Sequence, residues 1–310
     1  MSLFLITGGA GFIGSHLTAA LLQRNDQVRV LDNFATGKRS NIELFSEAVR
    51  NGTLDVIEGD VRDADTVCRA MKNVDYVLHL AAVVSVPQSM VDPQLTHAVN
   101  VEGTLNILNS ARHYDVKRVV LSSSCAVYGD NTDLPLKETS QTKPLSPYAA
   151  TKLMGEIYCQ TYQRAYGLPT ACLRYFNIYG PRQDPKGDYA AVIPKFIERM
   201  KAGQAPTIFG DGEQTRDFVH VSDVVRANLL ACWRDEAIGR VFNVASGVGL
   251  SLVQLVETLN QIQERRIGPQ FAPERLGDIR HSRGDGSYSA EVLGFTPQMS
   301  LIDGLRGFYE

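Results

Sequence analysis

The feature that most constrains this chain is a glycine-rich turn between its first apolar run and its first helical pattern. The run Leu3–Thr7 is predicted to form a short strand, and a helix is expected from Ile13 to Gln23. The turn carries glycines at G-x-x-G-x-x-G spacing, one residue off the commoner dinucleotide fingerprint: Gly8, Gly11 and Gly14. Glycines let the backbone approach a pyrophosphate closely, and a helix N-terminus offers free N–H groups and a positive dipole end. The turn therefore predicts a dinucleotide-binding site.

An acidic residue stands where such a site needs one. A second apolar run, Gln27–Asp32, ends on a carboxylate 18 positions after Gly14. In dinucleotide-binding folds this residue meets the adenosine ribose hydroxyls, and its charge would repel a 2′-phosphate, so NAD is favoured over NADP. Lys38 and Arg39 would suit a phosphate, but they lie in a Gly- and Ser-containing loop and are expected to be solvated.

Strand-like and helical patterns alternate along the first half of the chain. Further strands are expected at residues 54–58, 76–80, 118–122 and 170–174. This alternation predicts an α/β fold with a Rossmann-type doubly wound parallel sheet, whose ligands bind at the carboxyl ends of the strands. After Asn177 the alternation breaks, so we expect an NAD-binding domain over 1–176 and a smaller α/β substrate-binding lobe over 177–310. The segment 218–247 is expected to return to the first domain.

Tyr148 and Lys152 are four residues apart in a helix that Ser146 can cap and Pro147 can open, so they share one face. A phenol has a pKa of about 10, and lowering it to about 7 requires about 4 kcal/mol. One positive charge about 4 Å away supplies roughly that much at an effective dielectric of about 20. The pair is therefore predicted to be a tuned general base, with Lys152 alone nearly sufficient. The other interpretation is a surface tyrosine beside a solvated lysine.

Composition excludes several classes of protein. The 310 residues carry a formal net charge of −3 with acids and bases interspersed, so neither nucleic acid nor a membrane surface is an expected partner. The first apolar run is too short for a signal peptide. The five cysteines are scattered and form no C-x-x-C, so we expect reduced thiols and no metal site. Reduced thiols favour a cytoplasmic location.

Together these motifs resemble the extended short-chain dehydrogenase/reductase family, in its nucleotide-sugar 4-epimerase branch. The resemblance covers the whole chain. Besides the glycine turn and Asp32-Asn33, it rests on Gly59-Asp60-Val61, His79-Leu80-Ala81-Ala82, Asn100, Ser122–Ser124 with Tyr128-Gly129, Tyr148 with Lys152, Arg174–Asn177, Thr215–Val221 and Arg275–Asp278.

The resemblance implies roles for individual residues. Tyr148 would be the catalytic base, Lys152 its electrostatic partner and Ser124 the third catalytic residue. Residues implied to hold NAD are Gly8, Gly11, Phe12, Ile13, Asp32, Asn33, Gly37, Asp60, Val61, Leu80, Ala81, Ala82, Asn100, Ser122, Tyr148, Lys152 and Phe176. Residues implied to bind the substrate are Ser124, Tyr148, Asn177, Val192, Thr207, Phe209, Arg216, Arg275, Asp278 and Ser282.

Ser282 bears on the choice of substrate. In epimerases restricted to glucose and galactose, a bulky aromatic residue stands at this position, four residues after the aspartate of Arg-x-Gly-Asp. A serine leaves room for a 2-acetamido group, unless Ser282 is simply an exposed loop residue. Arg216 and Arg275 can clamp a diphosphate, although Arg216 could instead form a surface ion pair with Asp217.

The expected activity is the NAD-dependent interconversion of UDP-N-acetylglucosamine and UDP-N-acetylgalactosamine through a transient 4-keto intermediate, with UDP-glucose and UDP-galactose as further candidate substrates. One alternative is a UDP-glucose 4-epimerase only. Dehydratases and decarboxylases of this family carry acidic residues directly after the serine, where this chain has Cys125 and Ala126, and we interpret Cys125 as a small packing residue. A non-enzymatic NAD-binding regulator would be expected to lose Tyr148 and Lys152. The family also implies a homodimer through a four-helix bundle built from residues 93–114 and 148–166.

Overall fold

The alternating strands assemble into one large parallel sheet at the centre of the molecule. In this computed structural model residues 1–185, 191–274 and 279–309 are described. The seven strands of the large sheet lie in the order β10 (Arg240–Val244), β6 (Thr170–Tyr175), β5 (Arg118–Ser124), β4 (Tyr76–His79), β1 (Leu3–Thr7), β2 (Gln27–Asp32) and β3 (Leu54–Glu58). Every neighbouring pair is parallel. The order reverses between β1 and β4, which is where such sheets bind dinucleotides.

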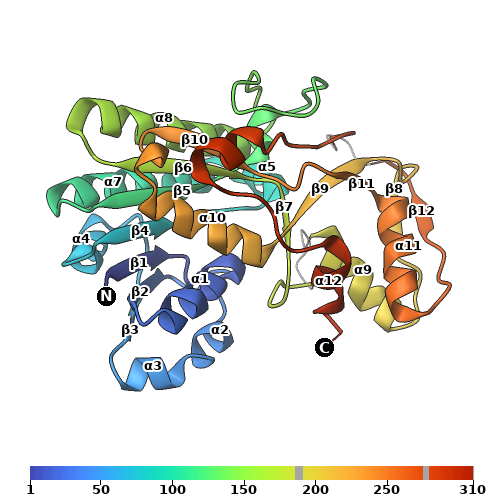
Figure 1. The fold of residues 1–310 in the computed structure, drawn as a ribbon, viewed down its shortest axis with the longest axis horizontal. Helices are drawn as coiled ribbons and strands as arrows, with labels where there is room; N and C mark the ends of the chain where they lie inside the picture. The colour runs from blue at the N-terminus through green and yellow to red at the C-terminus, as the bar shows by residue number, and fades with distance from the viewer. Residues whose placement is uncertain (186–190, 275–278, 310) are drawn as a thin grey trace.

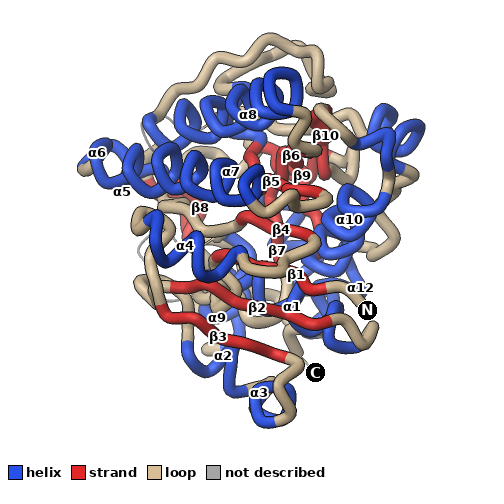
Figure 2. Tube along the Cα trace, turned by 90° about the vertical axis from the view of Figure 1, so that its left-hand side faces the viewer, coloured by secondary structure: helices blue, strands red, loops and turns tan. Residues whose placement is uncertain are grey.

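Helices cover both faces of this sheet (Figures 1 and 2), as a doubly wound fold requires. One apolar cluster joins the sheet to α1 (Phe12–Gln23), α10 (Val221–Trp233), α2 (Arg39–Glu43) and α3 (Ser46–Arg50). A second cluster, on the opposite face, joins it to α4 (Ala64–Met71), α7 (Gly103–His113) and α8 (Pro147–Tyr166). The predicted Rossmann-type fold class is therefore confirmed.

The predicted helix over residues 93–114 is interrupted. The segment consists of α6 (Pro93–His97), a π-helical turn η1 (Ala98–Glu102) and α7, and it follows the short α5 (Val86–Val91). By contrast, α8 begins and ends as its sequence predicts. Its first turn contains Pro147, the Ser146 hydroxyl accepts from the Ala149 N–H at 3.2 Å, and the helix stops at Gly167, whose φ is +71°.

A smaller lobe is assembled mostly from later segments, at the right of Figure 1. It contains α9 (Val192–Lys201), α11 (Leu252–Gln263) and α12 (Leu301–Arg306), which share a third apolar cluster. Its strands form a three-stranded sheet, β11 (Gly249–Ser251), β9 (Thr215–His220) and β7 (Asn177–Tyr179), and a pair, β12 (Gln270–Ala272) with β8 (Thr207–Phe209). Short helical turns lie at η2 (Cys125–Tyr128), η3 (Asp235–Ala237) and η4 (Ser289–Leu293).

The helices of the described ranges include none that combines the length and the apolar character needed to cross a bilayer.

Candidate active site

The glycine turn lies against the end of β4. Gly8 has a φ of +70°, and a Cβ there would stand 2.9 Å from the Ala81 backbone nitrogen, so only glycine fits. Helix α1 begins at Phe12 with Gly11 as its N-cap and no side-chain cap, which leaves its first N–H groups available to an anion. This close backbone approach beside an uncapped helix end fits the pyrophosphate of NAD.

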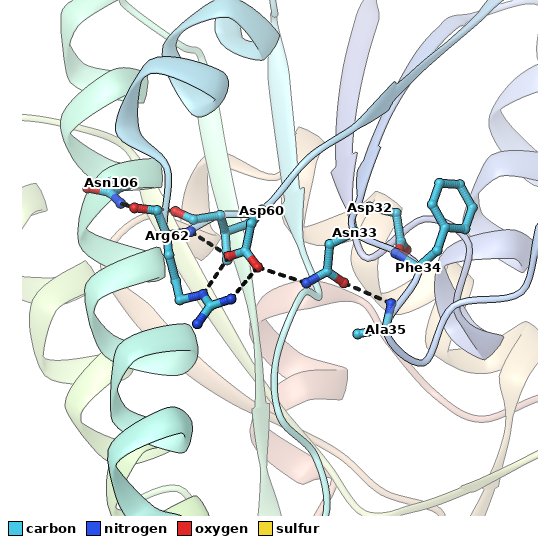
Figure 3. Close-up of polar contacts among 8 residues, drawn as sticks. Asp32, Asn33, Phe34, Ala35, Asp60, Arg62 and Asn106 are labelled. Atoms are coloured by element: carbon cyan, nitrogen blue, oxygen red, sulfur yellow. Dashed lines mark hydrogen bonds and ion pairs between the residues drawn. The ribbon is translucent and has the colours of Figure 1, made fainter.

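Carboxylates stand where β2 and β3 end, on the predicted adenosine side (Figure 3). Asp32 accepts hydrogen bonds from the backbone N–H of Ala10 at 2.9 Å and of Phe34 at 2.8 Å, and its burial raises its pKa. Asn33 donates to Asp60 at 2.8 Å, and the Arg62 guanidinium holds the pKa of Asp60 at about 2. The two carboxylates are therefore fixed before any ligand binds.

The nearby basic residues are engaged elsewhere. Lys38 forms an ion pair with Asp184 at 2.6 Å, and Arg39 forms one with Glu58 at 2.7 Å. Gly37 lies so close to Asp32 that a Cβ would be 2.7 Å from its Oδ1. This arrangement fits a ribose diol better than a 2′-phosphate, because the buried carboxylate repels a second anion.

Several residues proposed for the cofactor are buried or hold other groups. Val61, predicted for the adenosine side, is buried, and so are Ser122 and Phe176, predicted for the nicotinamide side. Asn100, in the π-helical turn, accepts from the Val83 N–H at 2.8 Å and donates to Thr151 at 3.0 Å. It thereby joins the loop after β4, which contains Leu80, Ala81 and Ala82, to α8. A π-helical turn often marks a functional position.

The three predicted catalytic residues converge where β5 meets α8. The Lys152 ammonium donates to the Ser122 carbonyl oxygen at 2.7 Å and lies 5.9 Å from the centroid of the Tyr148 ring. Ser124 ends β5, and its side chain lies close enough to the Tyr148 hydroxyl to oppose a rise in the pKa of the phenol. Tyr148 is partly exposed, whereas Lys152 is buried. The arrangement brings the ring of Tyr148 close to a buried cation.

The expectation that Lys152 alone would nearly suffice to lower the pKa of Tyr148 is wrong. Burial raises the pKa of Tyr148 to about 12, and the Ser124 hydrogen bond only opposes this increase. Burial also lowers the pKa of Lys152 to about 8, against the charge of Glu156. The sequence estimate counted the attraction between the two groups but not the cost of moving both charged forms out of water. The phenolate therefore needs further positive charge.

Two buried networks behind these residues were missed by sequence reasoning. The His79 ring bonds to Thr7 at 2.7 Å and Thr104 at 3.0 Å, and Thr7 in turn accepts from the Ala81 N–H at 3.2 Å. Burial lowers the pKa of His79 to about 3, so the ring is neutral.

The second network centres on Glu156, one turn after Lys152. It accepts from Ser123 at 2.5 Å and forms a buried ion pair with Arg174 at 2.7 Å. The i,i+4 spacing of Lys152 and Glu156 was the available sequence signal.

The predicted substrate residues that the structure describes lie mainly on β7, β8, β9 and α9 of the smaller lobe. Asn177 on β7 pairs with Phe218 of β9 and donates to the Asp217 backbone oxygen at 3.3 Å, which places it next to the strand that carries Arg216. Val192 opens α9 and belongs to the same apolar cluster as Ile208, the residue between Thr207 and Phe209 on β8. Arg275 and Asp278 lie outside the described residues.

Ser282 is not an exposed loop residue, since only 6% of its surface is accessible. Its N–H donates to the Thr215 carbonyl at 3.1 Å, and its side chain lies close enough to the Cys125 thiol to oppose the rise in the pKa of that thiol. Burial raises the pKa of Cys125 to about 11. Cys125 therefore does more than fill space: it joins the serine at the proposed specificity position to the residue after Ser124.

The alternative prediction, a surface ion pair between Arg216 and Asp217, is also wrong. The two residues are successive on β9, and successive side chains of a strand point to opposite faces. Asp217 is fully buried, while Arg216 is partly exposed and donates to the Thr215 carbonyl at 2.9 Å.

Comparison with known proteins shows the family of this chain. Residues 4–245 match the NAD dependent epimerase/dehydratase family. A UDP-glucose 4-epimerase of Mycolicibacterium smegmatis is 40% identical over 303 residues, covering 97% of this chain and 95% of the relative.

Two solved structures are similarly close. The UDP-N-acetylglucosamine 4-epimerase of Methanobrevibacter ruminantium, in complex with UDP-N-acetylmuramic acid, is 39% identical with a TM-score of 0.92, covering 99% of this chain and 98% of that one. The UDP-glucose 4-epimerase of Thermus thermophilus, in complex with NAD, is 37% identical with a TM-score of 0.87, covering 98% and 96%.

Proposed function

The chain belongs to the NAD dependent epimerase/dehydratase family, and on this basis we propose that it interconverts UDP-N-acetylglucosamine and UDP-N-acetylgalactosamine. At the coarser level it is a nucleotide-sugar 4-epimerase, an isomerase that depends on NAD. The proposal concerns the sugar: an acetylated hexosamine, with plain UDP-hexoses as further candidate substrates.

The observation that carries this proposal is the small, buried Ser282 against Cys125. Cys125 follows Ser124 directly in the chain. Ser282, which we propose to face the sugar, therefore lies near the end of β5, where the proposed catalytic residue Ser124 stands. A tyrosine in place of Ser282 would occupy space beside that strand end, whereas a serine leaves it for a 2-acetamido group. The M. ruminantium neighbour, named for an acetylated substrate, supports the same assignment.

In the mechanism we propose, Tyr148 exchanges a proton with the C4 hydroxyl of the sugar. Bound NAD would supply the two-electron oxidation at C4 and, through its cationic ring, further positive charge beside the phenol. Gly8, the uncapped start of α1 and Asp32 would hold it. Tyr148 removes the hydroxyl proton when C4 becomes a carbonyl and returns it when C4 is reduced. Ser124 orients the hydroxyl oxygen of Tyr148. The positive charge of Lys152 stabilises the negative charge that develops on that oxygen.

Arg216 and Asn177 are proposed to anchor the nucleotide while the 4-keto sugar turns. An anchored diphosphate keeps either face of the ring within reach of the same catalytic residues. Binding energy from the nucleotide, which does not react, is thereby used to orient the reacting carbon.

Cys125 and Ala126 argue against a dehydratase or decarboxylase. Elimination of water needs an acid and a base at these positions. Ala126 has no ionisable group, and a thiol whose pKa burial raises to about 11 stays protonated at neutral pH. A non-enzymatic NAD-binding regulator would not need the arrangement of Tyr148, Ser124 and Lys152.

Incubation of the purified protein with UDP-N-acetylglucosamine, followed by separation of the products, tests the proposal. Formation of UDP-N-acetylgalactosamine without added oxidant or reductant is expected. Turnover of UDP-glucose alone would support the UDP-glucose 4-epimerase alternative, and bound NAD without turnover of either sugar would support the regulator.

We also propose a homodimer through a four-helix bundle built from residues 93–114 and 148–166, and a cytoplasmic location consistent with five free cysteines. Exposed Met154 and Ile157 give α8 an apolar outer face. Light scattering should give twice the chain mass, and Ile157→Lys should shift it to one chain mass. The division into a cofactor domain over 1–176 and a substrate lobe stays a prediction.

A further inference from the structure

The Asp217 carboxylate accepts four hydrogen bonds, all from residues far from it in the sequence. Its Oδ1 accepts from the Ser246 N–H at 2.7 Å and the Ser246 hydroxyl at 2.6 Å. Its Oδ2 accepts from the Gly247 N–H at 3.0 Å and the Gly284 N–H at 3.1 Å. Because all four groups donate, the side chain acts as a fully buried anion. Removing its charge would leave several buried donors without a good acceptor.

The four donors come from two segments, so Asp217 joins three parts of the chain. Ser246 and Gly247 follow β10, the edge strand of the large sheet. Gly284 lies two residues after Ser282, and Asp217 itself lies on β9 next to Arg216. The carboxylate is thus the point at which the large sheet, the Arg216 strand and the Ser282 segment meet.

The surroundings connect this point to the proposed substrate residues. The segment that contains Ser282 is held from both sides: the Ser282 N–H donates to Thr215, and the Gly284 N–H donates to Asp217. The Ser282 side chain then reaches Cys125, whose pKa is raised further by the Asp217 charge. A shift of Asp217 would therefore move Arg216, proposed to bind the diphosphate, together with Ser282, proposed to face the sugar.

We propose that Asp217 is a positioning residue for the nucleotide sugar: its buried carboxylate fixes β9 and the 282–284 segment so that Arg216 and Ser282 meet the same substrate. This inference rests on the proposed function for the identity of the substrate. The Asp217 carboxylate accepts its hydrogen bonds from Ser246, Gly247 and Gly284, none of which is assigned to NAD or to proton transfer, so we expect its loss to act on substrate binding and not on the proton transfer.

Asp217→Asn is the test, and Asp223→Asn is its matched control. Asp223 is also a buried carboxylate that holds a distant segment, accepting from the Gln298 N–H at 2.9 Å, the Met299 N–H at 3.1 Å and Arg226 at 2.9 Å. Both substitutions leave buried donors unsatisfied and should lower Tm. A purely structural role would therefore affect both variants in the same way.

The measurements are the Kd for UDP by calorimetry, the KM and kcat for UDP-N-acetylglucosamine, and the amount of bound NAD. In Asp217→Asn we expect the UDP Kd and the KM to rise by about tenfold or more, as loss of a charged hydrogen bond predicts, with bound NAD unchanged. In Asp223→Asn both values should stay within about threefold of the wild type. Equal UDP affinity in the two variants, or loss of NAD together with UDP in Asp217→Asn, would overturn the inference.

Ser246→Ala provides a milder variant if Asp217→Asn does not fold. It removes one donor, the hydroxyl at 2.6 Å, and keeps the carboxylate. A smaller rise in UDP Kd is expected, and an unchanged Kd would contradict the proposal. If the wild type binds UDP in this Asp217-dependent way but epimerises no sugar, the proposed function fails and the inference stands.

Discussion

The Lys152 ammonium donates to the Ser122 carbonyl oxygen at 2.7 Å, which fastens α8 to the last residues of β5. One turn further along α8, Glu156 accepts from the neighbouring Ser123 and pairs with Arg174 on β6. The helix that carries Tyr148 is therefore held at two successive turns to the strand that ends in Ser124.

Glu156→Gln should destabilise the protein strongly. The substitution leaves Arg174, whose side chain is only 6% exposed, without its anionic partner. Removal of one partner from a buried ion pair costs about 3–5 kcal/mol. Urea unfolding of this variant and of Glu58→Gln, whose ion pair with Arg39 is exposed, measures the difference. Equal free energies of unfolding for the two variants would show that the buried pair contributes no more to stability than the exposed pair.

Gly37→Ala should weaken NAD binding while the fold persists. The new Cβ would stand 2.7 Å from Asp32 Oδ1 and 2.9 Å from Ala10 Cβ, and two backbone hydrogen bonds prevent Asp32 from moving freely. Overpacking of this kind costs about 1–3 kcal/mol, which corresponds to about 5-fold to 150-fold in Kd if the strain opposes the bound state. Calorimetry with NAD measures it, and Gly268→Ala, where a Cβ meets nothing within 4 Å, is the control. Unchanged affinity in Gly37→Ala would remove Asp32 from the NAD site.

His79 should make the protein sensitive to mild acid. Its pKa falls from 6.5 to about 3 on folding, so the unfolded chain binds more protons than the folded protein between these values. Stability is therefore complete above pH 6.5 and is lost as the pH falls, by roughly 1 kcal/mol at pH 5.5 from this residue.

Denaturant unfolding at pH 7.5 and 5.5 checks this difference. His79→Gln should lose less stability between the two pH values than the wild type does. His113→Gln, at an exposed helix end, should lose as much as the wild type. Parallel losses in all three proteins would contradict a neutral, buried His79.

Ser282→Tyr should suppress acetylated substrates selectively. A phenol in place of the buried hydroxyl competes for the space proposed for the 2-acetamido group, whereas a plain UDP-hexose has only a hydroxyl there. The kcat/KM values on acetylated and plain UDP-hexoses measure the effect, with the exposed Ser287→Tyr as control. An equal loss on both kinds of substrate would refute the role given to Ser282.

Local patterns predicted the cofactor half of the molecule well. The apolar runs ending at Thr7 and Asp32, and the glycines between them, depend on residues close in sequence, and the structure places strands β1 and β2 and helix α1 at those positions. The helix carrying Tyr148 was likewise predictable because its cap, its proline and its terminal glycine are local signals.

What the sequence could not supply depends on distant contacts. The donors to Asp217 come from residues 29, 30 and 67 positions away, and the partners of His79 from 72 and 25. Single-sequence patterns do not encode such pairings. The error over the Tyr148 pKa has the same origin, because burial is a property of the assembled fold. The π-helical turn at Ala98–Glu102 was missed because a helical pattern does not distinguish it from an α-helix.

The proposed epimerisation depends most on the Tyr148 hydroxyl as the group that exchanges a proton at C4. Tyr148→Phe keeps the ring and removes only that oxygen, so NAD binding and UDP affinity should persist. The turnover number on UDP-N-acetylglucosamine, measured by product separation, should fall by at least about 100-fold, the lower range for loss of a general acid–base group. Turnover of Tyr148→Phe at the wild-type rate would contradict the account.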